Sequence, residues 1–290
     1  MAMHEQSREL GAGLVGTLCL PDSGVRVSRV GVVLFNAGVV HRIGPHRVNV
    51  KLARALAEHG VPSIRLDLHG LGDSAPASAG LAHEQQVVAD LRLGIDELQQ
   101  AAGTPRVSML GFCSGVLPSV QCAQRDPRVV QVLLYDGINV STPRARRRHL
   151  LLRLRARILD PRSMLRLAHR VGGALRHTLT RGADFDQEPG LPRAAQIAPA
   201  LTGLVARGVD VVVLHAGADY SEVNDPRQAE RAFAACGVGG LRFEFLDTAD
   251  HVLTSTSAQR LFVDTLRGIV LQAAADVPAR PAMRPAEGVA

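Results

Sequence analysis

Short apolar runs alternate along the chain with segments in which apolar residues recur every three or four positions. The run Val30–Asn36 ends in Asn-Ala-Gly and predicts a fully buried strand, and Val48–Glu58 has leucines at helical spacing before Gly60. Further strands are predicted at 62–68, 106–110, 129–135, 210–215 and 241–246, and further helices at 84–100, 114–124, 226–235 and 258–272. Such alternation predicts an α/β fold, with a mostly parallel, doubly wound sheet covered by helices on both faces.

The alternation stops between Asp136 and Asp210. We therefore predict a core formed by 12–136 and 209–275, an inserted helical cap at 137–208, and a flexible Ala/Pro-rich tail at 276–290. Within the insertion, leucine spacing in His149–Leu159 and Met164–Leu175 predicts helices with an apolar face. The cap is expected to cover one end of the sheet.

A nucleophile turn is predicted where the strand at 106–110 meets the next helix. The sequence there is Gly111-Phe112-Cys113-Ser114-Gly115, which has the spacing glycine, any residue, nucleophile, any residue, glycine. The middle residue of such a turn is strained, so the residues two positions away must be small. Gly111 and Gly115 flank Cys113 at that spacing, and the sequence therefore predicts Cys113 as the nucleophile and Ser114 as an oxyanion donor through its backbone N–H.

A nucleophile of this kind needs a base and an acid further along the chain, in that fold's order of nucleophile, acid and histidine. His251 follows the last predicted strand and is the expected general base. Asp219, in the turn after the strand at 210–215, is the preferred acid, and Asp136, after the strand at 129–135, is the alternative. Asp219 and Asp136 therefore remain the two candidates for the acid.

The loops after the first two core strands complete the predicted site. Gly38, after the strand at 30–36, is the expected second oxyanion donor. The glycine-containing loop Asp67–Ser74 is predicted to be structural, and His41 and His46 are predicted to be exposed loop residues near the entrance.

Composition places the chain among ordinary globular proteins. It has 290 residues, 46% of them apolar, and no apolar run approaches the ~20 residues of a membrane-spanning helix. Cys19, Cys122 and Cys236 lie far from one another and from Cys113, without CxxC spacing, which favours neither a disulfide framework nor a zinc site. A cytoplasmic enzyme without cofactor or metal is expected.

Positive charge is concentrated in one segment. Residues 141–182 contain twelve arginines and one acid, a local charge of +11, whereas the whole chain carries +6. Such a segment favours an anionic partner such as an acyl carrier protein, coenzyme A or an anionic lipid surface. Nucleic acid is not expected, because aromatic residues for base stacking and a recognisable binding module are missing.

Together these residues resemble the α/β-hydrolase superfamily over residues 12–275, with a cysteine at the elbow. Within it the chain is similar to the small hydrolases associated with exosortase loci in bacteria, through Gly44-Pro45-His46-Arg47, the Asp67–Ser74 turn, the elbow cysteine, and Ala249-Asp250-His251. It departs from them at Ser114, where an acid is expected. Dienelactone hydrolases and polyhydroxyalkanoate synthases are more distant relatives with the same elbow cysteine.

The resemblance implies cleavage of an acyl ester or thioester through an acyl-cysteine intermediate. An acyltransferase that passes the acyl group to an amine, alcohol or thiol is the alternative, and a non-catalytic binding protein of the same fold is a second one. The acyl group, the leaving group and the oligomeric state are not predicted.

Overall fold

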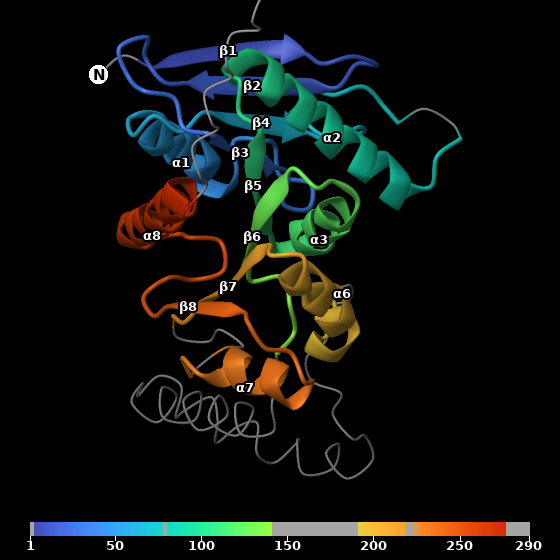
Figure 1. Cartoon of the computed structure of the whole chain (residues 1–290), viewed down its shortest axis with the longest axis vertical. Coiled ribbons are helices and arrows are strands. Elements are labelled where there is room, and N and C mark those ends of the chain that lie inside the picture. The colour runs from blue at the N-terminus through green and yellow to red at the C-terminus, as the bar shows by residue number, and fades with distance from the viewer. Residues whose placement is uncertain (1–2, 78–79, 141–190, 219–222, 224, 277–290) are drawn as a thin grey trace, which may run out of the picture.

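The computed structural model describes residues 3–77, 80–140, 191–218, 223 and 225–276. In this part of the chain, one eight-stranded sheet runs through the molecule in the order β1-β2-β4-β3-β5-β6-β7-β8 (Figure 1). Its strands are β1 (His4–Glu9), β2 (Val15–Leu20), β3 (Val30–Phe35), β4 (Ser63–Asp67), β5 (Arg106–Phe112), β6 (Val129–Tyr135), β7 (Asp210–Ala216) and β8 (Arg242–Leu246).

Helices connect the strands from β3 onward. They are α1 (Val48–Ala57), α2 (His83–Ala102), α3 (Val116–Arg125), α6 (Ala194–Ala206), α7 (Gln228–Ala235) and α8 (Thr256–Asp276), with short 3-10 turns η1 (Pro45–Arg47) and η2 (Cys113–Gly115). β2 pairs antiparallel with β1 and β4, and all the other neighbouring strands are parallel. The predicted mostly parallel sheet is confirmed.

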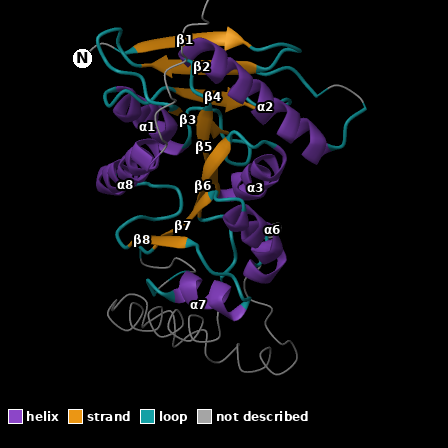
Figure 2. Ribbon diagram, viewed as in Figure 1, coloured by secondary structure: helices purple, strands orange, loops and turns teal. Residues whose placement is uncertain are grey.

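Helices cover both faces of the sheet. Figure 2 shows α1 and α8 on one face and α2, α3 and α6 on the other. Each face has its own apolar cluster, in which helix residues such as Leu52 and Phe262 pack on one side and Leu91 and Leu201 on the other. Burial on both faces explains why a strand such as β3 is apolar at every position.

Two elements differ from the sequence prediction. The strands β1 and β2 form an antiparallel hairpin at the sheet edge, so the core begins at His4 and not at residue 12. The helix α6 falls inside the predicted insertion 137–208, but its residues Ile197, Leu201 and Leu204 pack in the core beside α3. Residues 194–206 therefore belong to the core, where α6 provides the crossover between β6 and β7, and the rest of the predicted insertion stays a prediction.

Most of the predicted cap lies outside the described residues, as do the arginine-rich segment 141–182 and nearly all of the predicted tail. Asn139 forms an isolated parallel bridge with Arg193, with its N–H 2.9 Å from Pro192 O. The residues on the two sides of 141–190 thus lie side by side, and the first of them follow Asp136 by only a few positions in the chain.

The longest of the described helices is α8, with 21 residues. Neither it nor any other described helix has the length and apolar character required to span a bilayer.

Candidate active site

The predicted turn between β5 and α3 has the strained geometry of a nucleophile elbow. Cys113 has φ +52°, a left-handed conformation that costs free energy for a side-chain-bearing residue, whereas Ser114 is not among the described positive-φ residues. A Cβ on Gly111 would lie 2.7 Å from Gly115 O, and one on Gly115 would lie 3.1 Å from the Phe35 ring. The predicted requirement for small residues on both sides of Cys113 is confirmed.

Strand register brings the next site residue beside this elbow. Phe112 of β5 is level with Tyr135 of β6, so the residues that follow them, Cys113 and Asp136, leave the sheet at the same edge. Asp136 also has a positive φ, +48°, and its N–H donates to Leu214 O at 3.0 Å. A tightly fixed turn therefore directs the Asp136 carboxylate at the carboxyl end of the strands.

His251 reaches the same place from the loop between β8 and α8. The buried Tyr135 hydroxyl donates to Asp250 O at 3.0 Å and anchors this loop to the sheet. The Phe112 ring meets the His251 ring edge-on at a centroid distance of 6.0 Å. His251 Nδ1 lies 3.2 Å from Asp136 Oδ2, and the same imidazole is hydrogen-bonded to Cys113.

These contacts shift the acid–base properties of the pair. The hydrogen bond with Asp136, followed by the one with Cys113, raises the pKa of His251 to about 10. Burial raises the pKa of Asp136, but hydrogen bonds with His215 and His251 outweigh burial and hold this pKa below its ordinary value. An ionised Asp136 beside His251 stabilises the imidazolium form of that histidine.

The carboxylate that the structure brings to His251 is thus Asp136, the alternative acid of the sequence analysis. The preferred acid, Asp219, lies outside the described residues, and its role stays a prediction. The sequence order alone favoured Asp219, whereas the register of β5 and β6 and the left-handed turn at Asp136 are features of the folded chain.

The two predicted oxyanion donors meet at the elbow. Gly38, with φ +56°, donates its N–H to Ser114 Oγ at 2.7 Å. Ser114 follows Cys113 at the start of the turn that leads into α3. Gly38 therefore lies at the elbow as expected, although in this structure a hydroxyl oxygen already accepts its N–H.

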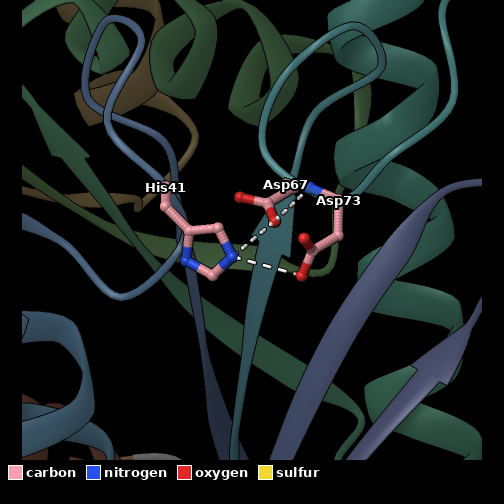
Figure 3. Close-up of side chains that lie close together, drawn as sticks. All are labelled: His41, Asp67 and Asp73. Atoms are coloured by element: carbon pink, nitrogen blue, oxygen red, sulfur yellow. Dashed lines mark hydrogen bonds and ion pairs between the residues drawn. The ribbon is translucent and has the colours of Figure 1, made fainter.

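A cluster of charged residues fixes the loop that carries Gly38. Figure 3 shows His41 and Asp73 beside the fully buried Asp67, with His41 Nε2 3.2 Å from Asp67 Oδ2 and 3.3 Å from Asp73 Oδ2. Arg42 Nη1 is in contact with these same atoms, at 2.7 Å from Asp73 Oδ2, at 2.8 Å from His41 Nε2, and in an ion pair with Asp67. Although three such side chains could ligate a metal ion, the guanidinium nitrogen already lies among them.

Asp67 also holds both loops through backbone groups, as expected of a structural turn. Its carboxylate accepts the N–H of Arg42 at 2.7 Å and of Asp73 at 3.1 Å, as well as the side-chain amide of Asn36 at 2.9 Å. Gly72 fits against it with φ +54°, where a Cβ would lie 2.2 Å from the carboxylate. The structural role predicted for Asp67–Ser74 is confirmed.

The other cysteines have environments unlike that of Cys113. Burial raises the pKa of Cys19 to about 11 and that of Cys122 to about 12. Cys236 is exposed at the end of α7. Cys113 alone among the cysteines is in hydrogen-bond contact with His251 within the described residues.

One residue at the site was not singled out in the sequence. His215, near the end of β7, is buried, and its Nδ1 lies 3.2 Å from Asp136 Oδ1. A histidine in a predicted buried strand has no distinguishing local pattern. Its only signal was its place at the carboxyl end of a strand next to that of Asp136.

Comparison with known proteins identifies the family of the chain. Residues 31–180, more than half of the chain, match the family described as serine aminopeptidase, S33. The chain belongs to this family. It is a hydrolase-family protein with the α/β-hydrolase fold, as predicted. The family is of the serine type, whereas this chain has Cys113 at the strained position and a serine one position later.

Solved structures show the same fold at low sequence identity. An α/β serine hydrolase without a lid from Xanthomonas campestris is 17% identical, with a TM-score of 0.51 over 97% of this chain and 98% of that one. The esterase domain of a Rhodothermus marinus protein is 16% identical (TM-score 0.54; 93% and 99% covered), and Est1E from Butyrivibrio proteoclasticus is 14% identical (0.53; 94% and 99%). No curated protein sequence matches the chain.

Proposed function

We propose that the protein hydrolyses acyl esters or thioesters through an acyl-cysteine intermediate on Cys113. The observation that carries this proposal is the contact series from Cys113 to His251 and from His251 to Asp136 at a left-handed elbow. Esterases among the structural neighbours support ester chemistry for this fold. The thiol in place of a serine hydroxyl extends the proposal to thioesters, since exchange of an acyl group between two thiols is nearly balanced.

In the proposed reaction His251 first takes the proton of the Cys113 thiol. The thiolate attacks the acyl carbonyl carbon, and the new C–S bond forms as the carbonyl oxygen becomes an oxyanion. His251 then gives its proton to the leaving alcohol or thiol as that bond breaks. Water, deprotonated by His251, attacks the acyl-cysteine and releases the acid, and the proton returns to the thiolate of Cys113.

The oxyanion is assigned to the backbone N–H groups of Ser114 and Gly38. Support comes from the position of Gly38 against the elbow, with its N–H 2.7 Å from Ser114 Oγ. The Ser114 hydroxyl occupies the place at this donor that a substrate oxygen would take. Rotation of the exposed Ser114 side chain about χ1 frees the Gly38 N–H for the oxyanion.

Apolar side chains beside the site favour an apolar acyl group. Val39 follows Gly38 in the chain and is 86% exposed. Leu117 lies in α3, just after the elbow, and is 39% exposed. Val252 follows His251 and is 46% exposed. Exposed apolar side chains that are close in sequence to site residues are candidates for contact with an apolar part of the substrate. We assign them to the acyl chain of the substrate.

The arginine-rich segment gives the proposal its second part. Asn139 and Arg193, which flank residues 141–190, pair with each other. Asn139 lies three residues after Asp136, and Arg193 lies at the start of α6. A segment anchored there is well situated to act as the predicted cap. The local charge of +11 on residues 141–182 favours acyl groups carried on coenzyme A or on an acidic carrier protein, and such binding weakens as salt rises.

One panel of substrates tests the function. Acyl-CoAs, carrier-bound acyl groups and p-nitrophenyl esters are each supplied with and without amine or alcohol acceptors, at low and high salt, to the wild-type enzyme and Cys113→Ala. We expect free acid as the product, no turnover by Cys113→Ala, and kcat/KM values for CoA or carrier substrates that fall with salt. Undiminished turnover by Cys113→Ala would contradict the proposal, and acyl product found mainly on an added acceptor would establish an acyltransferase instead.

A further inference from the structure

The Asp136 carboxylate is shared between two imidazoles. Its Oδ2 lies 3.2 Å from His251 Nδ1, and its Oδ1 lies 3.2 Å from His215 Nδ1. Oδ1 also accepts the N–H of Ala216 at 3.0 Å. Two donors from β7 therefore hold one carboxylate oxygen and leave the other oxygen for His251.

The sheet register places His215 there. Tyr135 of β6 is level with Leu214 of β7, so Asp136 and His215 follow at the same level, as Cys113 and Asp136 do across β5 and β6. Three adjacent parallel strands thus deliver Cys113, Asp136 and His215 to one edge in a row. His251 is the only member of this group that comes from a loop beyond the last strand.

The environment of His215 fixes its tautomer. The residue is 3% exposed, and its Nε2 has no hydrogen-bond partner in the part of the chain that the structure describes. An imidazolium would leave a buried Nε2–H without an acceptor, which is costly, whereas the neutral ring with its proton on Nδ1 donates only to Asp136. Nδ1 is therefore the nitrogen of His215 that donates to the Asp136 carboxylate.

We propose that His215 is a positioning residue that holds Asp136 ionised and oriented for His251, an inference that rests on the proposed function of Cys113, His251 and Asp136. Without the Nδ1–H donor, only the N–H of Ala216 holds Oδ1, and the carboxylate is less well stabilised and less firmly oriented. His251 then stabilises the Cys113 thiolate less well. The other titratable groups around Asp136 and His251 in the described residues include Cys113, the Tyr135 hydroxyl, which donates to Asp250 O, and the Asp250 carboxylate.

The test compares variants that differ in one donor. In His215→Asn the amide nitrogen takes the position of Nδ1, and in His215→Leu a side chain of similar bulk has no donor. His59→Leu is the matched control, because His59 is exposed just after α1 and its side chain bonds only to Ala55 O among the described residues. Far-UV circular dichroism and thermal unfolding check folding, and His215→Gln, whose amide is one bond further out, replaces His215→Leu if that variant does not fold.

Two readouts follow, one of which needs no substrate. The rate of Cys113 alkylation by iodoacetamide is measured against pH, with the labelled peptide resolved by mass spectrometry, and kcat and KM are measured on the best ester. For His215→Leu we expect kcat to fall about tenfold or more with KM within about twofold, and the alkylation midpoint to move to higher pH. His215→Asn should retain most of the wild-type rate and midpoint.

A wild-type midpoint and kcat in His215→Leu would overturn the inference, and so would an equal loss in His215→Asn, which would show that only packing is involved. Failure of the proposed function is distinguishable. If Cys113 is unreactive in the wild-type enzyme, the thiol mechanism itself is contradicted, whereas a reactive Cys113 whose midpoint ignores residue 215 contradicts only the role of His215.

Discussion

An Asp→Asn substitution, which replaces one carboxylate oxygen by an NH2 group, can show whether Asp136 or Asp219 is the acid. Asp136→Asn removes the carboxylate that pairs with His251 Nδ1, and we expect kcat to fall on the order of a thousandfold with the fold intact. By the same reasoning the pKa of His251, measured by NMR titration, should drop from about 10 toward its ordinary value, because the Asp136 hydrogen bond is the largest cause of its shift. Asp219→Asn is the parallel variant.

A mild effect of Asp136→Asn together with a large effect of Asp219→Asn would assign the acid to Asp219. Stability gives a second check with a definite sign. The folded-state pKa of His251 lies above the ordinary value of 6.5, so its contribution to the free energy of unfolding is complete below about pH 6.5 and is lost as pH rises through about 10. This dependence should be smaller in Asp136→Asn.

At the residue scale, local sequence patterns led to the prediction of Cys113 and His251. Cys113 was fixed by its flanking glycines, and His251 by its place after the last strand. The choice of acid was not decidable in this way, because Asp136 and Asp219 both follow strands that end near the elbow. His215 carried no local signal beyond its place at the carboxyl end of a predicted strand, since its contact with Asp136 comes from the register between β6 and β7.

At the element scale, the turn after β6 must approach the elbow closely. A Cβ on Gly137 would lie 2.1 Å from Cys113 O and 2.3 Å from Val116 Cγ2. Gly137→Ala should therefore displace the elbow, with a loss of about 1–3 kcal/mol in the free energy of unfolding and a marked loss of activity. Denaturant unfolding and kcat measure the two effects.

Gly203→Ala is the control for this prediction. Gly203 lies within α6, where nothing is found within 4 Å of an added Cβ. Helix propensity then favours alanine by about 0.5–1 kcal/mol, and activity should not change. If Gly137→Ala behaved as Gly203→Ala does, the close contact between the β6 turn and the elbow would be wrong.

The elements were predictable where burial alone decides the pattern. Strands such as β3, buried on both faces, have continuous apolar runs. The strand β1 has the sequence His-Glu-Gln-Ser-Arg-Glu with almost every residue exposed, so no apolar periodicity marked it, and it is held as an edge strand by pairing with β2. The helix α6 was missed because Pro199 lies within it and because it follows the arginine-rich segment.

At the scale of the whole molecule, the cluster of His41, Arg42, Asp67 and Asp73 joins the loops after β3 and β4. It thereby fixes the loop that carries Gly38, the proposed oxyanion donor. Arg42→Met would leave the fully buried Asp67 without its charged partner, and we expect a loss of about 3 kcal/mol in the free energy of unfolding. Arg54→Met is the matched control, since the Arg54 side chain is 46% exposed and its pair with Glu5 should contribute less than about 1 kcal/mol. Equal losses in urea denaturation would contradict the central place given to Arg42.

The site itself is assembled from both halves of the chain. The elbow and the Gly38 loop belong to the first half, whereas His215 and His251 come from the second, and the central strands β5, β6 and β7 bring them together. The cap predicted at 137–208 would be added to this frame at the turn after Asp136. The contacts among Cys113, Asp136, His215 and His251 are made at the carboxyl ends of β5, β6 and β7 and by the loop after β8.

The central claim is that Cys113 carries the acyl group, and trapping that intermediate tests it most directly. The enzyme is mixed with a slowly hydrolysed acyl ester, quenched in acid and digested, and the acylated peptide is identified by mass spectrometry in the wild-type protein and in Cys113→Ala. We predict one acyl adduct, on Cys113, that is sensitive to neutral hydroxylamine and absent from Cys113→Ala, with Cys19, Cys122 and Cys236 unmodified. An adduct on Ser114, or one that persists in Cys113→Ala, would contradict the account.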